Sequence, residues 1–199
     1  MKIFLATGNL NKIKEMEKIL ENVKNLEILT LKDGIEIPEI IENKETFEDN
    51  SIKKAVEIAK YLNMIVIADD SGLCARALGG APGIYSARFA GEHKNDLDNN
   101  NKLIKELKNK EDRHAKFVSV ITIANPRGNY KSFHGEICGE IIDNSLGENG
   151  FGYDPHFYLR DYQMTIAQLP TDEKNRISHR AKALELLKAE IDTILVEFN

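Results

Sequence analysis

The stretch Met64-Ile65-Val66-Ile67-Ala68-Asp69-Asp70-Ser71-Gly72 runs from five apolar residues directly into two acidic residues, a serine and a glycine. A short apolar run that ends in turn residues predicts a buried β-strand. Carboxylates at the end of such a strand lie at the carboxyl edge of a sheet, where open α/β folds bind ligands. Asp69 and Asp70 also repel each other unless they share a cation or one is protonated. The stretch therefore indicates either a metal-assisted active site or a plain strand followed by an Asx turn.

Composition narrows the class of protein. We expect residues 1–199 to form one domain, or two intimately packed lobes, with a real hydrophobic core. The net charge of −5 argues against a binder of nucleic-acid polymers. No apolar run approaches the roughly 20 residues that a membrane span needs. Cys74 and Cys138 lack the spacing of a zinc site, so we expect reduced thiols in a soluble cytoplasmic protein.

The first 23 residues predict a strand, a polar turn and a helix. Residues 2–6 read as a buried strand, and apolar residues at helical spacing follow from Leu10 to Val23. The turn between them carries a glycine, two asparagines and Lys12. A glycine-bearing turn at a helix N-terminus presents backbone N–H groups and the helix dipole to an anion. The turn is either such an anion site or a plain link with a solvated lysine.

The middle of the chain predicts further strands and helices. We expect a strand over 26–31, an irregular arm over 35–44, a helix over 47–62 capped by Thr46, and a polar helix over 95–110. The inner face of that polar helix is predicted to be Leu97, Leu103, Ile104 and Leu107. Residues 114–124 and 130–142 predict a long antiparallel hairpin with His114 and His134 on its surface.

Two motifs near the C-terminus carry aromatic and basic groups. Gly150-Phe151-Gly152-Tyr153-Asp154-Pro155 places rings between glycines, which suits stacking on a flat base but also suits a buried glycine-rich turn. From Pro170 onward we expect one long terminal helix. Its first turns carry Lys174, Arg176, His179 and Arg180. Because acids are usual at a helix start, this basic cluster indicates an anionic ligand.

Five separate blocks, in order along nearly the whole chain, resemble the inosine triphosphate pyrophosphatase family. The blocks are Thr7-Gly8-Asn9-x-x-Lys12, Ala68 to Leu73, Gly79 to Arg88, Gly150 to Pro155, and Glu173-Lys174-x-x-x-Ser178-His179-Arg180. The resemblance implies an elongated α/β fold: a mixed, twisted sheet flanked by helices, with the active-site cleft between two lobes. It also implies a homodimeric, Mg²⁺-dependent hydrolase that converts dITP, ITP and XTP or dXTP to the monophosphate and pyrophosphate.

The resemblance assigns roles to residues that match the family motifs. Asp70 is the expected proton acceptor and a metal ligand, with Asp69 in a supporting role. The metal set is completed by Glu42, with Glu39 as the substitute, because Ile41 stands where the family motif has its first glutamate. The expected substrate-binding residues are Thr7, Gly8, Asn9, Leu10, Asn11, Lys12, Ser71, Phe151, Gly152, Tyr153, Asp154, Lys174, His179 and Arg180.

Three other interpretations stay open at the sequence level. Asp70-Ser71-Gly72 also resembles the active turn of aspartic proteases, which are nearly all β. A nucleotide-binding module without chemistry would use the same turn and aromatic loop. A related pyrophosphatase of similar fold would act on other modified nucleotides. The helices predicted above argue against the protease.

Overall fold

The first strands of the chain divide their side chains between two apolar cores. In the computed structural model, which describes residues 1–21, 23–24, 26–91 and 95–198, β1 (Lys2–Leu5) pairs in parallel with β3 (Ile65–Ala75). Ile3 and Leu5 lie in one core, and Phe4 lies in the other. This follows from the strand pleat, which points successive side chains to opposite faces of a sheet.

The remaining elements follow in chain order within the described residues. The helices are α1 (Leu10–Leu20), α2 (Phe47–Leu62), α3 (Asp96–Leu107), α4 (Thr171–Ile177) and α5 (His179–Glu197). The other strands are β2 (Glu27–Leu29), β4 (His114–Ala124), β5 (Tyr130–Ile141), β6 (Phe157–Leu159) and β7 (Met164–Thr165). None of these helices has the length and hydropathy that crossing a bilayer requires.

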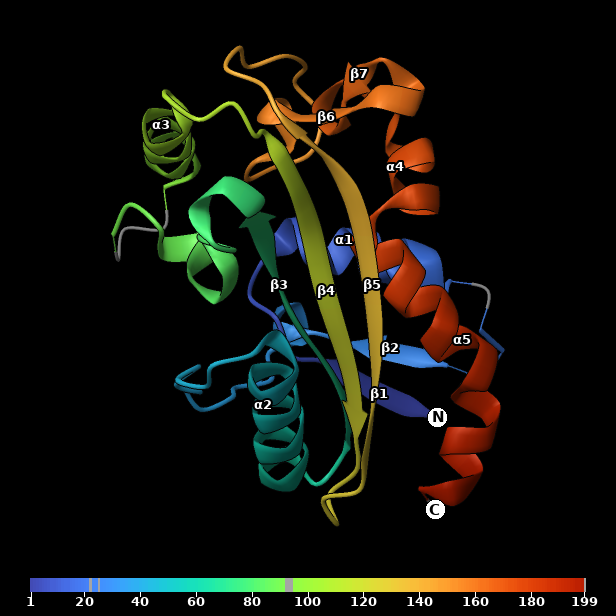
Figure 1. The fold of residues 1–199 in the computed structure, drawn as a ribbon. Coiled ribbons are helices and arrows are strands. Elements are labelled where there is room, and N and C mark those ends of the chain that lie inside the picture. The colour runs from blue at the N-terminus through green and yellow to red at the C-terminus, as the bar shows by residue number, and fades with distance from the viewer. Residues whose placement is uncertain (22, 25, 92–94, 199) are drawn as a thin grey trace. The chain divides into compact units, whose positions relative to one another are not determined.

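The strands form one mixed sheet in the order β2-β1-β3-β4-β5-β6-β7 (Figure 1). β1 is parallel to both β2 and β3, whereas β6 is antiparallel to β5 and β7. The predicted mixed α/β sheet flanked by helices is therefore confirmed. It also contradicts the aspartic-protease interpretation, because that class is nearly all β.

The chain separates into two compact units. Unit 1 comprises Met1–Asp70, Ser119–Gly135 and Arg180–Asn199, and unit 2 comprises Ser71–Val118 and Glu136–His179. The boundaries therefore fall inside β3, β4 and β5 and just after the start of α5. The expectation of one domain built from two lobes stays a prediction.

Unit 1 has a core on each face of its part of the sheet. On one face, α1 and α5 pack against β1, β3 and the ends of β4 and β5. On the other face, α2 packs against β1 and β3, and Figure 1 shows α2 and α5 on opposite sides of these strands. Burial of both faces explains why the first strands are continuously apolar.

Unit 2 has a single core that surrounds Phe117 and Phe157, whose ring centroids are 4.7 Å apart. Leu103 and Leu107 of α3 are fully buried in it. This core supports the loop from Gly150 to Asp154, because Tyr153 is one of its members.

The acidic pair does not lie at the end of its strand, contrary to the sequence prediction. β3 continues through Asp69, Asp70 and Gly72 to Ala75. It continues because apolar burial resumes at Leu73 and Ala75, which are fully buried in the core of unit 2. The two carboxylates instead lie beyond the carboxyl end of β1, whose last residue pairs with Ile67.

The predicted long terminal helix is wrong, because the chain breaks into α4 and α5 at Ser178. Ser178 adopts an extended conformation, with φ −64° and ψ 160°, and its N–H closes the last turn of α4 on the Lys174 carbonyl. Serine favours helix ends over helix interiors because its hydroxyl competes for backbone groups. His179 and Arg180 consequently occupy the first turn of a new helix, which carries no acid there.

The predicted inner face of α3 is partly wrong. Leu97 is 67% exposed, whereas Asn99 and Asn100 are buried. Burial of the two asparagines is tolerated because their side-chain amides donate to backbone carbonyls of neighbouring loops.

Other local predictions are confirmed with small differences. Thr46 caps α2 through the N–H of Asp49, at 3.0 Å, and residues 125–129 form the turn between β4 and β5. The predicted second strand is shorter, Glu27–Leu29. His114 and His134 are exposed.

Gly139 of β5 is predicted to be intolerant of a side chain. A Cβ at this position would lie 2.5 Å from Cε1 of Phe157 and 2.6 Å from the Tyr158 carbonyl oxygen. We expect Gly139→Ala to lower the free energy of unfolding by about 1–3 kcal/mol, because overpacking displaces neighbouring backbone. Urea denaturation would measure this change. Cys138→Ala, on the adjacent exposed position, is the control and should change stability by less than about 0.5 kcal/mol; equal stability of both variants would contradict the close packing of β6.

Candidate active site

Asp69 and Asp70 point to opposite faces of β3. The pleat places Asp69 on the face of Ile67, which packs in the core of α1 and α5, and Asp70 on the face of Ala68, which packs against α2. Both carboxylates are buried, with 1% and 7% of the residue exposed. The expected mutual repulsion is therefore a minor effect, and the pKa of Asp70 is raised more by Glu42 than by Asp69.

Asp69 is surrounded by groups that stabilise its negative charge. Lys12 Nζ lies 2.5 Å from Oδ2, Ser119 Oγ donates to Oδ1 at 2.6 Å, and Arg180 Nη2 is 3.6 Å from Oδ2. Burial alone would raise the pKa of Asp69, but these cations and hydrogen bonds bring it well below its ordinary value. Asp69 is therefore an ionised anchor for two cations and a poor candidate for proton transfer.

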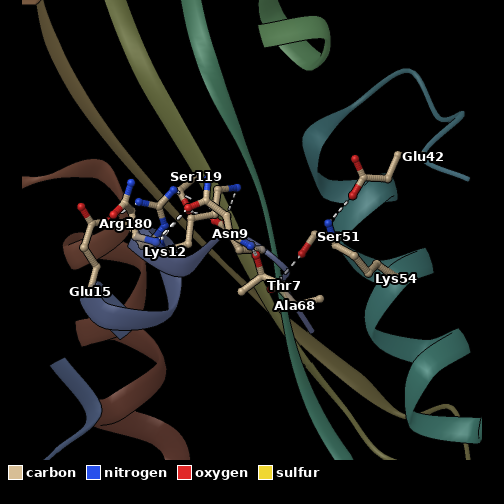
Figure 2. A network of polar contacts seen from close by, with 12 residues as sticks. Thr7, Asn9, Lys12, Glu15, Glu42, Ser51, Lys54, Ala68, Ser119 and Arg180 are labelled. Carbon is tan, nitrogen blue, oxygen red and sulfur yellow. Dashed lines mark hydrogen bonds and ion pairs between the residues drawn. The ribbon is translucent and has the colours of Figure 1, made fainter. Parts of the chain in front are cut away.

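Arg180 joins a second buried carboxylate to this group. Its Nη1 donates to Glu15 of α1, and both side chains are almost fully buried. Figure 2 shows Glu15, Lys12 and Arg180 together on one side of β3. Two cations thus face two carboxylates, which limits the desolvation cost that an unpaired buried charge would carry. The predicted contact of Arg180 with a substrate base stays a prediction.

The turn before α1 leads into a helix, as predicted, and the structure shows that the helix start is capped. Asn9 is the N-cap, and its Oδ1 accepts from the N–H groups of Asn11 and Lys12 at 2.9 and 3.2 Å. Thr7 Oγ1 accepts from the N–H of Asn9 at 3.2 Å. Two amides that were expected to face an anion are therefore already bonded within the turn. The exposed residues of the turn are Gly8, Asn9, Leu10 and Asn11.

Asp70 faces a mixed pair of charges on the α2 side. Burial raises the pKa of Asp70 to about 6, while the Lys54 ammonium opposes this rise and the Glu42 carboxylate adds to it. Lys54 Nζ donates to Glu42 Oε1, and Figure 2 shows this pair on the side of β3 opposite to Arg180. Asp70 is therefore a buried carboxyl group whose affinity for a proton is raised above the ordinary value.

α2 fixes both the strand and the arm that carries Glu42. Ser51 Oγ donates to the Ala68 carbonyl at 3.3 Å, and Lys53 Nζ donates to the Ile41 carbonyl at 2.7 Å. Adjacent lysines thus hold adjacent residues of the arm. Lys54 turns inward, toward Glu42.

The carboxylate oxygens at and near Asp70 are of the ligand type that Mg²⁺ binds. Mg²⁺ takes oxygen ligands and usually only one or two protein carboxylates, with the rest from water and phosphate. Glu42 is half-buried and its negative charge raises the pKa of Asp70, whereas Glu39 is exposed. No cluster of three or more metal-binding side chains occurs among the described residues, so any magnesium site here is a sparse one. Of the two candidate glutamates, Glu42 is the one whose charge raises the pKa of Asp70.

In unit 2 the aromatic loop carries its own ion pair. Lys174 Nζ lies 2.7 Å from Asp154 Oδ2 and 4.6 Å from the centroid of the Phe151 ring. Asp154 Oδ2 also accepts from the N–H of Phe151, at 3.0 Å. Gly150 has a φ of +80°, and a Cβ there would overlap the Asp154 carboxylate. Only glycine at this position allows the carboxylate to reach under the loop.

Three more predicted residues of this unit have different environments. The Tyr153 ring is buried and its hydroxyl donates to the Ser86 carbonyl at 2.7 Å, so the side chain anchors the loop. The His179 ring stacks on Phe117 with centroids 4.8 Å apart. Ser71 is half-buried on β3.

The predicted residues divide between the two units. The group in unit 1 consists of Thr7, Gly8, Asn9, Leu10, Asn11, Lys12, Glu42, Asp70 and Arg180. The group in unit 2 consists of Ser71, Phe151, Gly152, Tyr153, Asp154, Lys174 and His179.

Several partner residues were missed by the sequence analysis. Glu15 bonds Arg180, Ser119 bonds Asp69, and Ser86 bonds both Tyr153 and the N–H of Leu73. The one local signal was a charged residue, Glu15, beside the apolar stripe of α1. Ser119 had none, because a serine in an alternating strand is ordinary.

Comparison with known proteins identifies relatives over the whole length. A model of the Ham1 family matches residues 3–190. The dITP/XTP pyrophosphatase of Desulfotalea psychrophila is 49% identical, over 97% of this chain and 86% of the relative. The dITP/XTP pyrophosphatase of Clostridium perfringens is also 49% identical, over 98% of each chain. The structure of the Staphylococcus aureus Ham1 protein has a TM-score of 0.88 at 44% identity, covering 98% of this chain and all of that one.

The family motifs and the fold thus agree over nearly the same span of sequence. Because the family model covers all the predicted site residues, and relatives share almost half of their residues across that span, the chain belongs to the Ham1 family.

Proposed function

We propose that this chain hydrolyses non-standard purine nucleoside triphosphates, namely dITP, ITP and XTP or dXTP, to the monophosphate and pyrophosphate. The observation that carries this proposal is the full-length similarity to proteins named dITP/XTP pyrophosphatase, at 44–49% identity. The charged groups of unit 1 support this hydrolysis, because a buried carboxyl group can accept a proton and the cations beside it can bind phosphate.

Asp70 acts as the proton acceptor for the attacking water. Burial raises the pKa of Asp70 above that of an ordinary carboxyl group, which makes it a better proton acceptor than its neighbour Asp69. Asp69 cannot substitute for it, because Lys12 and Arg180 hold the pKa of Asp69 far below that of Asp70. The two adjacent acids therefore have different roles.

Asp70 and Glu42 hold the metal ion in this proposal. Mg²⁺, when bound, supplies positive charge that neutralises the phosphate oxygens. Lys54 keeps Glu42 in place when no ligand is present, because its ammonium pairs with that carboxylate.

The turn before α1 receives the phosphate chain. Lys12 is held at the helix start by Asp69, and the helix dipole adds positive potential at the same point. Thr7 and Asn9 keep the turn in shape through their bonds to its amides. Charge that develops on the departing pyrophosphate is thereby stabilised by groups fixed before the reaction.

The family resemblance assigns base recognition to Phe151, Asp154, Lys174 and Arg180. Phe151 provides the stacking surface, and Asp154 and Lys174 provide polar groups beside it. Arg180 is the proposed donor to the 6-oxo group of hypoxanthine or xanthine. Adenine has an amine at that position, so a donor there is left without an acceptor, which disfavours ATP.

Two further features complete the proposal, namely a homodimer and a cytoplasmic location. Cys74 and Cys138 form no disulfide, as suits a reducing compartment.

A substrate panel tests the reaction directly. We expect pyrophosphate release from dITP, ITP and XTP and little from ATP or dTTP, and Asp70→Asn should reduce kcat by about 10²–10⁴-fold because the proton acceptor is lost. Binding of ITP without pyrophosphate release would instead indicate a non-catalytic module. Preference for a methylated nucleotide would indicate a related pyrophosphatase. Asp70→Asn with more than a tenth of the normal activity would contradict the role of Asp70.

The metal ligand is tested by Glu42→Gln, with Glu39→Gln as its matched control. We expect Glu42→Gln to raise the Mg²⁺ concentration for half-maximal activity about tenfold or more, because one of two carboxylate ligands is removed. Glu39→Gln should leave this concentration unchanged. Titration of activity with Mg²⁺ measures both, and the reverse order would transfer the ligand role to Glu39.

Base discrimination is tested by Arg180→Ala. We expect the ratio of kcat/KM for ITP to that for ATP to fall by roughly tenfold, since a hydrogen bond to the 6-oxo group is lost. The ratio is measured on one protein sample, so it is insensitive to the stability that the buried ion pair with Glu15 contributes. An unchanged ratio would mean that another group reads the base.

A further inference from the structure

The Phe151 loop is built from residues that do not hold a conformation by themselves. Gly150 and Gly152, on either side of Phe151, have φ angles of +80° and +62°. Glycine reaches this region freely, but it also loses the most conformational entropy when it is fixed. A loop that must present a ring in one orientation therefore needs external ties on its backbone.

Three consecutive peptide groups around Phe151 are tied by side chains. The N–H of Phe151 donates to Asp154 at 3.0 Å, and the N–H of Gly152 donates to Asp96 Oδ2 at 2.8 Å. The carbonyl of Gly152 accepts from Asn100 Nδ2 at 2.9 Å. Since these groups belong to the peptides before Phe151, after Phe151 and after Gly152, the backbone angles of both residues are fixed.

Two of these three ties come from one face of α3. Asp96 and Asn100 are four residues apart, so their side chains emerge from the same side of the helix. Asp96 is exposed in the first turn, and its carboxylate makes a charge-assisted bond. Asn100 is buried, and replacing it with an apolar residue would leave the Gly152 carbonyl without this hydrogen-bond donor.

α3 is itself anchored at both ends, which makes it a rigid support. Asn99 accepts from the N–H of Ala90 at 2.7 Å and donates to the Ala87 carbonyl at 3.1 Å. Leu103 and Leu107 are fully buried in the core of unit 2. The position of Gly152 is thereby set by the core of the unit as well as by its own loop.

We propose that Asp96 and Asn100 are positioning residues for base recognition, which act through Gly152 and hold the Phe151 ring in its stacking orientation. This inference rests on the proposed function, in which Phe151 stacks on the purine. It adds a helix that the family motifs do not include to the determinants of base binding.

Kinetics with ITP and ATP test the proposal. We expect Asp96→Ala and Asn100→Leu each to raise KM for ITP about tenfold, the equivalent of one hydrogen bond, with kcat changed by less than about threefold. Asp96→Asn keeps an acceptor oxygen and should restore most of the affinity. Asp98→Ala removes a neighbouring charge from the same turn of α3 and is the matched control. Equal falls in kcat and no change in KM, or an effect of Asp98→Ala as large as that of Asp96→Ala, would overturn the proposal.

A fluorescence experiment separates this inference from the proposed function. The chain contains no tryptophan, so Phe151→Trp introduces a single indole emitter at the loop. In that background we expect Asp96→Ala to lower the anisotropy of the indole emission and to increase its quenching by acrylamide, with Asp98→Ala unchanged. Unaltered anisotropy and quenching in Asp96→Ala would refute the tie even in an active enzyme. If Asn100→Leu fails to fold, Asp96→Ala, an exposed site, decides the outcome alone.

If the wild-type protein releases no pyrophosphate from any nucleotide of the panel, the proposed function fails. The fluorescence result would still stand as a measurement of whether α3 orders the loop. The two proposals therefore fail on different observations.

Discussion

The pleat of β3 is the constraint on which the charge arrangement of unit 1 depends. Because successive side chains of a strand point to opposite faces, two adjacent carboxylates are delivered into two different environments. Asp69 meets the cations of α1 and α5, whereas Asp70 meets the arm and α2. A separation of one residue along the chain thus becomes a large difference between the pKa values of the two carboxyl groups.

Burial makes the pairing of these charged groups necessary, and it makes the loss of one partner energetically costly. Glu15, Asp69 and Arg180 lose their hydration, and an ion that remained after removal of its partner would be strongly unfavourable. The same reasoning applies to backbone groups in unit 2. Gly150 allows the chain to turn closely around Asp154, and hydrogen bonds from Asp154 and α3 hold the peptide groups around Phe151. In both units, partners from distant segments hold the predicted site residues.

Capping residues and hydrophobic spacing in the sequence predicted the types of the elements and the residues that carry charged or polar groups. Thr46 and Asp49 predicted the start of α2, Asn9 and Lys12 predicted a helix start with a cation, and the alternation from His114 predicted the hairpin. Capping and periodicity depend on neighbours within a few residues, so they can be recognised in one sequence. The same local reasoning failed at two points. β3 continued to Ala75 because burial resumed there, and the terminal helix broke at Ser178.

The sequence by itself therefore determined the mixed α/β class, the family motifs and the residue types that can bind a nucleotide. Only the tertiary structure decided which partner each charged group has. Glu15 and Arg180 are 165 residues apart, Asp69 and Ser119 are 50 apart, and Gly152 and Asp96 are 56 apart. Such pairs form because folding brings distant elements together, and a local pattern carries no information about that event.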